Sequence, residues 1–528
     1  MKRLYTNAVI YSPNKLRADT IAVDNGRIIE IGNKSKLDSL KRHGFKVINL
    51  KGKTVFPGFI DSHLHLLSTG YGLLSVDLSN IDSLEKVLAK IEKAAKKHPA
   101  GQWLIGRGWN KNLWGNDFPT KEMLDKISPR NPALFFAKDG HTIWVNSLAI
   151  KAASVDEHTP DPEGGRIKRD SSGEATGVFM ENAVELISNK IPEASTEFKL
   201  KAIKKASAYF NSLGITGVGD CDWNPGRLGL FDIARKRGFL NLRVFMMLSP
   251  DDISSAKTLG LHTGFGDDFI TTGMLKLYMD GALGSQTAWM FEPYENSDHG
   301  CGVPTLSEDQ LESYFERTHL EGISMAVHAI GDRAIAELLD FFGKKYKISK
   351  KLGLKHRIEH AQHMRKEDIA RFKKYDVAVA VQPIHAMSDR DMSEKYIGKR
   401  SRWTYPFATM LKRGAKLGFG SDCPIEDPNP LMGIYAAIAR KSPADKRGPW
   451  YKEECVTLAQ AITGYTTGAA EICSWGGKCG DIAPGMKADF VVLSDDLYKI
   501  DTEQIPKVKV LATIVNGEIV YQNKAMKI

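Results

Sequence analysis

Two histidines follow an apolar run near the start of the chain, in the stretch T-V-F-P-G-F-I-D-S-H-L-H-L at 54–66. Successive side chains of an extended chain point to opposite faces, so His63 and His65 share one face with Asp61. Two imidazoles on one face suit a single metal ion. The alternative is a pair of histidines that are hydrogen-bonded at the end of a buried strand, and the motif alone does not decide between the two.

Further polar side chains stand at the ends of other short apolar runs, and most of their types match a metal centre. These candidates are Lys276, His328, His360 and Asp422. Neutral imidazoles and carboxylates hold catalytic zinc and leave one position open for water, whose pKa the metal lowers to roughly 7. We therefore predict a divalent metal, in the first place zinc, with one or two ions per chain and a hydroxide nucleophile at neutral pH.

Asp422 follows Gly418 and Gly420 on its own face of an apolar run, so small residues precede it where a barrel interior is crowded. A carboxylate here is expected to accept the proton of the nucleophile and to pass it to the leaving group. The alternative is an aspartate that caps the following helix.

Lys276 lies in the apolar sequence M-L-K-L-Y-M-D, where a buried ammonium is costly unless it is paired or neutralised. One solution is reaction with carbon dioxide, which gives a carbamate that could bridge two metals. The other is a salt bridge to a carboxylate elsewhere. Asp280 shares the Lys276 face, but four residues of strand span roughly 13 Å, so it is a poor direct partner.

Other candidates carry weaker signals. His141 is expected to hydrogen-bond a substrate carbonyl or oxyanion, with a purely structural histidine as the alternative. Four further residues adjoin the candidate ligands in sequence and are expected to orient imidazoles: Asp280, Asp332, Arg333 and Gln362. Trp103, Trp109, Trp114 and Trp144 are more typical of a hydrophobic core than of a pocket wall.

The candidate residues belong to a series of short apolar runs that alternate with helical stretches. Eight strands, mostly followed by helices such as 334–345 and 366–374, predict a parallel (β/α)8 TIM-like barrel within an α/β protein, with its chemistry at the carboxyl ends of the strands. The predicted strands cover 56–65, 214–220, 242–248, 274–280, 323–328, 356–360, 377–382 and 415–422.

Hairpin-rich segments occupy the two ends of the chain, with turn sequences at Asp24-Asn25-Gly26 and Asn516-Gly517. We expect residues 1–57 and 480–528 to form one composite β-sandwich beside a barrel of residues 58–479. The first two barrel strands are far apart in sequence, which predicts an insertion at about 72–210. An insertion that leaves the carboxyl end of a barrel strand is expected to roof the active site.

Bulk composition indicates an ordinary soluble protein. The formal charge is +10, but the basic residues are scattered, which gives no reason to expect a nucleic-acid partner. Six widely spaced cysteines indicate reduced thiols rather than a disulfide framework. The sequence has no evident signal peptide and no run of roughly 20 apolar residues, so we expect a cytoplasmic protein with no membrane partner.

Several motifs together resemble the amidohydrolase superfamily of metal-dependent hydrolases, in particular the branch of N-substituted formamide deformylases, amidohydrolase family 3. They are P-G-F-I-D-S-H-L-H at 57–65, D-G-H-T-I-W-V-N at 139–146, L-K-L-Y-M-D-G-A-L-G-S at 275–285, V-H-A-I-G-D-R-A at 327–334, R-I-E-H-A-Q at 357–362, G-S-D-C-P at 420–424 and G-M-K-A-D-F-V-V-L at 485–493. The resemblance implies metal ligands at His63, His65, His328, His360 and Asp422. It also makes Lys276 the position to test for carboxylation. A homodimer is a possible oligomeric state by the same resemblance.

The function expected from these residues is hydrolysis of a non-peptide C–N bond, of amide or N-formyl type, in a small-molecule substrate. Two alternatives remain at this stage: a heterocyclic amine deaminase with one metal, and a non-catalytic binding protein on the same fold. Nitrogen and oxygen ligands accept zinc, iron or manganese, so the residue types do not identify the metal. They do not identify the substrate either, because pocket specificity lies in loops.

Overall fold

The computed structural model describes residues 2–12, 18–115, 117–138, 141–298, 300–524 and 526. The chain divides into two units. The barrel unit consists of residues 1–66 and 206–528, and the insertion unit consists of residues 67–205.

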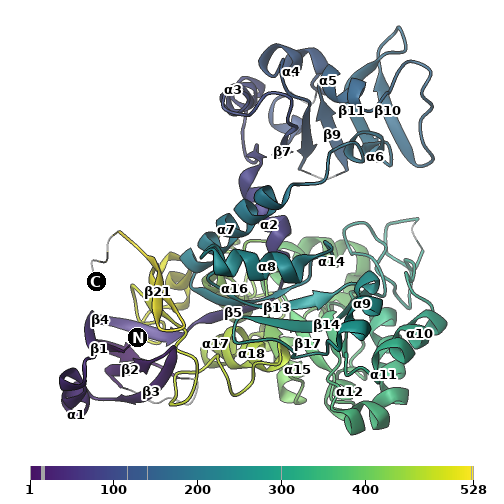
Figure 1. Ribbon diagram of the computed structural model, residues 1–528. Coiled ribbons are helices and arrows are strands. Elements are labelled where there is room, and N and C mark those ends of the chain that lie inside the picture. The colour runs from purple at the N-terminus through teal and green to yellow at the C-terminus, as the bar shows by residue number, and fades with distance from the viewer. Residues whose placement is uncertain are drawn as a thin grey trace. The chain divides into compact units, whose positions relative to one another are not determined.

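Parallel strands form the centre of the barrel unit, as the sequence predicts (Figure 1). In the described residues this sheet has eight strands: β5 (Phe59–Leu64), β12 (Ile215–Asp220), β13 (Arg243–Leu248), β14 (Ile270–Tyr278), β15 (Met325–Ala329), β16 (Arg357–His360), β17 (Ala378–Val381) and β18 (Leu417–Phe419). Backbone hydrogen bonds close the ring between its first and last strands. The amide of His65 donates to Cys423 at 2.8 Å, and the amide of Asp422 donates to His63 at 2.8 Å.

Helices follow most of these strands, which is the pattern of a (β/α)8 barrel. Those that follow strands are α8 (Arg227–Lys236), α9 (Ile253–Leu259), α10 (Glu308–Thr318), α11 (Asp332–Leu352), α12 (Ile369–Lys374), α13 (His385–Ser388), α14 (Arg390–Ile397), α15 (Phe407–Lys412), α16 (Pro430–Ala439), α17 (Leu458–Thr463) and α18 (Ala469–Ile472). Helix α11 ends where Gly353 adopts φ 71°, a left-handed conformation that glycine accepts at low cost.

Both ends of the chain build a second sheet in the barrel unit, where purple and yellow strands lie together in Figure 1. Among the described residues its order is β21-β20-β19-β4-β1-β2-β3. The strands are β1 (Arg3–Ile10), β2 (Thr20–Asp24), β3 (Arg27–Gly32), β4 (Lys46–Pro57), β19 (Phe490–Leu493), β20 (Val510–Val515) and β21 (Glu518–Gln522); a short helix, α1 (Lys34–Leu37), follows β3. Asn25, Gly26, Asn516 and Gly517 all have positive φ, as the predicted hairpin turns require.

The first apolar run of the sequence is divided between the two sheets. Strand β4 ends at Pro57 in the terminal sheet, and β5 begins at Phe59 in the barrel. Gly58 lies between them, where a Cβ atom would come within 2.4 Å of the Thr216 side chain. The run predicted as one barrel strand from residue 56 is therefore two strands, because Gly58 permits a close approach to β12 at their junction.

The insertion unit has its own sheet of parallel and antiparallel strands and its own hydrophobic core. Its strands are β6 (Val76–Asp77), β7 (Leu104–Trp109), β8 (Ala133–Ala137), β9 (Thr142–Val145), β10 (Gly165–Arg169) and β11 (Ala175–Glu181). Its helices are α3 (Leu84–Ala95), α4 (Lys121–Ile127), α5 (Ser147–Ala152) and α6 (Val184–Ser188), while α2 (Leu66–Leu74) and α7 (Thr196–Ser212) connect it to the barrel unit along the chain.

The cysteines and the helices also bear on the expectations of reduced thiols and of no membrane-spanning segment. All six cysteines lie in the described residues, and each is a free thiol. Within the part of the chain that the structure describes, no helix has both the length and the apolar character needed to cross a membrane.

Candidate metal centre

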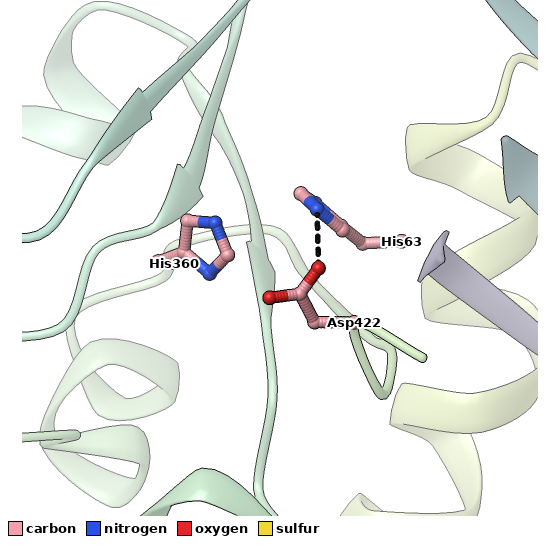
Figure 2. Close-up of side chains that lie close together, drawn as sticks. All are labelled: His63, His360 and Asp422. Carbon is pink, nitrogen blue, oxygen red and sulfur yellow. Dashed lines mark ion pairs between the residues drawn. The ribbon is translucent and has the colours of Figure 1, made fainter. Parts of the chain in front are cut away.

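Three buried side chains from distant parts of the sequence meet at the carboxyl ends of the barrel strands. His63 comes from β5, His360 ends β16, and Asp422 follows β18. One ligand atom from each lies within 4.8 Å of the other two (Figure 2). His63 Nε2 is 3.3 Å from Asp422 Oδ1, and His65 Nε2 is 3.3 Å from the same oxygen. Four of the six predicted ligands thus lie together, with the imidazoles of His63, His65 and His360 beside the Asp422 carboxylate.

Two of these residues have an unusual backbone conformation. His360 has φ 67° and Asp422 has φ 60°, both in the left-handed region that non-glycine residues seldom adopt. Such a conformation costs of order 1–3 kcal/mol per residue and persists where the surrounding structure enforces it, most often at functional sites. Both residues lie at strand ends, and their side chains meet that of His63 (Figure 2).

The other ring nitrogen of each clustered histidine contacts a buried acceptor. His63 Nδ1 is hydrogen-bonded to Glu359, which in turn pairs with Arg357. His360 Nδ1 donates to Gln382 Oε1 at 2.9 Å. His65 Nδ1 lies 3.3 Å from Asp222 Oδ1. Such partners fix the tautomer and the orientation of a ligand imidazole, so that Nε2 faces the metal.

These three acceptors were not among the residues predicted from sequence. Glu359 had a detectable signal, because it is a carboxylate in the buried strand R-I-E-H directly before a candidate ligand. Gln382 and Asp222 carry no such local signal, since each meets its histidine only through the strand register of the barrel. Cys221 also lies close to His63 and Glu359, in a second group of buried side chains.

Electrostatics favour the protonation states that metal ligands need at Asp422, His328 and His360, but not at His63 and His65. Burial would lower the pKa of both, but Cys221 and Glu359 raise the pKa of His63 well above its usual value, and hydrogen bonds with Asp222 and Asp422 raise that of His65 to about 10. Burial alone would raise the pKa of Asp422, but hydrogen bonds from His63 and His65 hold it well below its usual range. Burial lowers the pKa of His360 well below its ordinary value and that of His328 to about 3. Asp422 is therefore anionic at neutral pH, and His328 and His360 are neutral imidazoles.

His328 lies beside this group rather than within it. Its ring centroid is 4.5 Å from that of His360, and its Nε2 contacts the carbonyl oxygen of Gly281 at 3.0 Å. Asp280 Oδ1 is 3.6 Å from the same nitrogen. With Nε2 engaged in this way, Nδ1 is the ring nitrogen of His328 that is left for a metal.

Lys276 is fully buried on β14, and its Nζ has no hydrogen-bond partner among the described residues. This Nζ atom lies 4.2 Å from the centroid of the Tyr278 ring. Burial lowers the pKa of Lys276, which favours the neutral amine. The salt-bridge alternative therefore has no carboxylate partner in the described part of the chain. The buried His63, His360 and Asp422 side chains are of the types that hold a divalent metal.

Comparison with known proteins adds the decisive observation. The model of the amidohydrolase family matches residues 46–521 of this sequence, which is most of the chain. The chain belongs to the amidohydrolase family. It is an α/β amidohydrolase-type metal-dependent hydrolase, with the barrel and terminal sheet described above.

Individual relatives of this amidohydrolase match almost end to end. The YtcJ protein of Bacillus subtilis (strain 168) is 33% identical over 99% of this chain and 100% of its own length. An N-substituted formamide deformylase of Arthrobacter pascens is 26% identical over 96% of this chain and 95% of its own. The crystal structure of an uncharacterised metal-dependent hydrolase from Pyrococcus furiosus has a TM-score of 0.80 and 29% identity, and covers 94% of this chain and 99% of that one.

The remaining predicted site residues of this amidohydrolase occupy several environments. Asp280 accepts hydrogen bonds from the amides of Trp289, Ile330 and Gly331, and so anchors two loops next to His328. Asp332 accepts from the amide of Phe291 at 2.9 Å. Arg333 stacks over the Trp289 ring at 4.6 Å, while Gln362 donates to Asp389 at 3.0 Å.

His141 lies in the insertion unit, where its Nδ1 is 3.0 Å from Glu181 and its side chain is 63% exposed. The two residues before it in the D-G-H motif, 139 and 140, lie outside the described residues.

Trp109 and Trp144 are fully buried in the core of the insertion unit, and Trp103 and Trp114 pack against that core. These tryptophans are core residues, as their spacing suggested.

Proposed function

We propose that this amidohydrolase cleaves a non-peptide C–N bond of amide or N-formyl type and releases a carboxylic acid and an amine. The observation that carries the proposal is the joint presence of the His63, His360 and Asp422 group and a near-complete match to an N-substituted formamide deformylase. The strained backbone of His360 and Asp422 also favours a functional site over a purely structural cluster.

The metal supplies a Lewis acid, which polarises a carbonyl and makes water a better nucleophile at neutral pH. Asp422 performs the proton transfers of the reaction. Its carboxylate is anionic and lies between His63 and His65, so it can accept the proton of the attacking water. The same carboxyl group then delivers that proton to the departing nitrogen as the C–N bond breaks.

Lys276 is proposed to carry a carboxylated side chain. Its neutral amine attacks carbon dioxide, a nitrogen–carbon bond forms, and one proton leaves. The product is an anionic carbamate that offers two oxygen ligands where the free amine has no hydrogen-bond partner among the described residues. A carbamate would also give this buried polar side chain a partner in the bound metal. This modification would allow the site to hold two metal ions, which we propose to be zinc.

A substrate panel tests the proposal directly. The metal-loaded protein is incubated with N-formyl amines, simple amides and heterocyclic amines, and released formate, amine and ammonia are measured separately. Formate or carboxylate release that is lost on chelation supports the proposal. Ammonia release from the heterocyclic amines alone would replace it with the deaminase reaction.

A further inference from the structure

His385 lies at the carboxyl end of the barrel, where chemistry occurs in this fold, and is not one of the predicted ligands. It begins α13 directly after β17 and the short segment Gln382–Pro383–Ile384. Gln382, three residues earlier, accepts the hydrogen bond from His360 Nδ1. The His385 ring lies 6.3 Å from the His360 ring, centroid to centroid, and the two planes are inclined by only 16°. One connection therefore holds a candidate ligand and places a second imidazole beside it.

The Nε2 atom of His385 is buried and has no hydrogen-bond partner among the described residues. Only 8% of the residue is exposed. An unsatisfied buried polar group costs roughly 1–3 kcal/mol, so this nitrogen is a position where a bound ligand or water supplies the missing partner.

The surroundings of His385 restrain it. The amide of Asp389 donates to the His385 carbonyl at 2.9 Å, which closes the turn of the helix. The Asp389 carboxylate is itself held by the Tyr405 hydroxyl at 2.5 Å and by the Gln362 amide at 3.0 Å. A buried, hydrogen-bonded frame of this kind pre-organises the connection that carries the imidazole, as an electrostatic catalyst requires.

We propose that His385 Nε2 donates a hydrogen bond to the carbonyl oxygen of the scissile C–N group and stabilises the negative charge that develops on that oxygen. This inference rests on the proposed function and assigns to His385 the role that the sequence suggested for His141. His385 fits the role because its ring is stacked beside that of His360 and its buried Nε2 has no partner among the described residues, whereas His141 is exposed and pairs with Glu181. A hydrogen-bond donor matched to this oxygen limits the substrates to compounds with a carbonyl at the reacting carbon.

Replacement of His385 by phenylalanine tests the inference. We expect kcat for the best N-formyl amine or amide substrate to fall roughly 100- to 1000-fold, the usual effect of removing one oxyanion donor, while metal content stays at the wild-type level. His385→Gln keeps an N–H donor and should restore much of the lost kcat. His319→Gln, a buried histidine that follows α10, serves as the control and should keep wild-type kcat.

Two results would overturn the inference: wild-type kcat in His385→Phe, or a loss of bound metal that matches the loss of activity, which would make His385 a ligand. Binding of acetohydroxamate, a small carbonyl compound that binds metal centres, gives a readout that needs no turnover. His385→Phe should weaken this binding at least tenfold, as measured by calorimetry with metal-loaded protein. If the wild type hydrolyses no substrate of the panel, the proposed function fails, and the hydroxamate affinities alone decide the role of His385.

Discussion

His63 uses both of its ring nitrogens, one towards the candidate metal centre and one towards a buried ion pair. Nε2 lies 3.3 Å from Asp422, and Nδ1 is hydrogen-bonded to Glu359. Burial would raise the pKa of Glu359, but the positive charge of Arg357 lowers it to about 2. The carboxylate is therefore ionised throughout the physiological range and holds the imidazole with Nδ1 protonated.

Replacing Glu359 by glutamine tests this positioning role. Loss of the charge-assisted hydrogen bond should weaken metal binding about 10- to 100-fold. It also leaves Arg357 as an uncompensated buried charge, which should reduce the free energy of unfolding by about 3–5 kcal/mol. Metal titration and denaturant unfolding measure the two effects. Glu308→Gln removes a solvent-exposed carboxylate that pairs with Lys344 and should change neither; an unchanged metal affinity in Glu359→Gln would contradict the role.

Asp422→Asn tests the proton carrier. Asparagine keeps the shape of the side chain but cannot accept a proton, so we expect kcat to fall about 10²- to 10⁴-fold. The fold should persist, with an unchanged circular dichroism spectrum, because the backbone hydrogen bond from Asp422 to His63 does not involve the side chain. Retained kcat in this variant would remove Asp422 from the mechanism.

At the scale of elements, the metal centre depends on how closely β5 and the end of β18 approach each other. Gly420 makes this approach tolerable, since a Cβ there would lie 2.7 Å from the His63 amide nitrogen and 2.8 Å from Asp61 Oδ1. Ser421 donates to the other oxygen of Asp61 at 2.6 Å and so fixes the same segment. The positions of His63 and Asp422 are thus set by one tight contact between strands.

Gly420→Ala should disturb that contact. The added methyl group must displace β5 or the turn before Asp422, which we expect to cost about 1–3 kcal/mol of stability and to lower metal affinity. Gly229→Ala is the matched control, because a Cβ on helix α8 meets nothing within 4 Å and should stabilise by about 0.5–1 kcal/mol. Melting temperature and metal content distinguish the two. Full metal binding in Gly420→Ala would show that the close approach is not needed.

Much of the barrel and of the candidate metal centre could be predicted from the sequence. His63, His360 and Asp422 could be picked out because each ends an apolar strand, and parallel barrel strands end at the same face. Glu359, Gln382 and Asp222 could not be matched to their histidines, since those pairings depend on tertiary register. The sequence also could not predict that His385 Nε2 has no hydrogen-bond partner among the described residues, because the neighbours of a buried atom depend on the tertiary structure.

At the scale of the whole molecule, the C-terminal strands of the second sheet are tied to the barrel by a buried ion pair. Arg243 of β13 contacts Asp489, the residue before β19, with Nη2 2.8 Å from Oδ1. The amide of Asn516 also donates to this carboxylate at 2.8 Å. One carboxylate therefore joins the barrel, β19 and the β20–β21 hairpin.

Asp489→Asn should destabilise the barrel unit as a whole. Breaking the buried pair leaves Arg243 unpaired, at a cost of about 3–5 kcal/mol. Because the terminal sheet and the barrel share this contact, we expect a lower midpoint of denaturation for the barrel unit without a separate early transition of the terminal sheet. Asp232→Asn, which affects a solvent-exposed pair with Lys236 on α8, should leave the midpoint essentially unchanged. An independent early transition would contradict the coupling.

The measurement that tests the account most directly is metal content per chain. Elemental analysis is made on protein purified without chelator and with bicarbonate present, in parallel with a His63→Ala/His360→Ala variant. We predict two equivalents of divalent metal in the wild type, a bicarbonate-dependent second equivalent if Lys276 is carboxylated, and less than one-tenth of an equivalent in the variant. One equivalent that is indifferent to bicarbonate would leave Lys276 unmodified. Well-folded wild-type protein without metal, or a variant that still binds it fully, would contradict the assignment of the site.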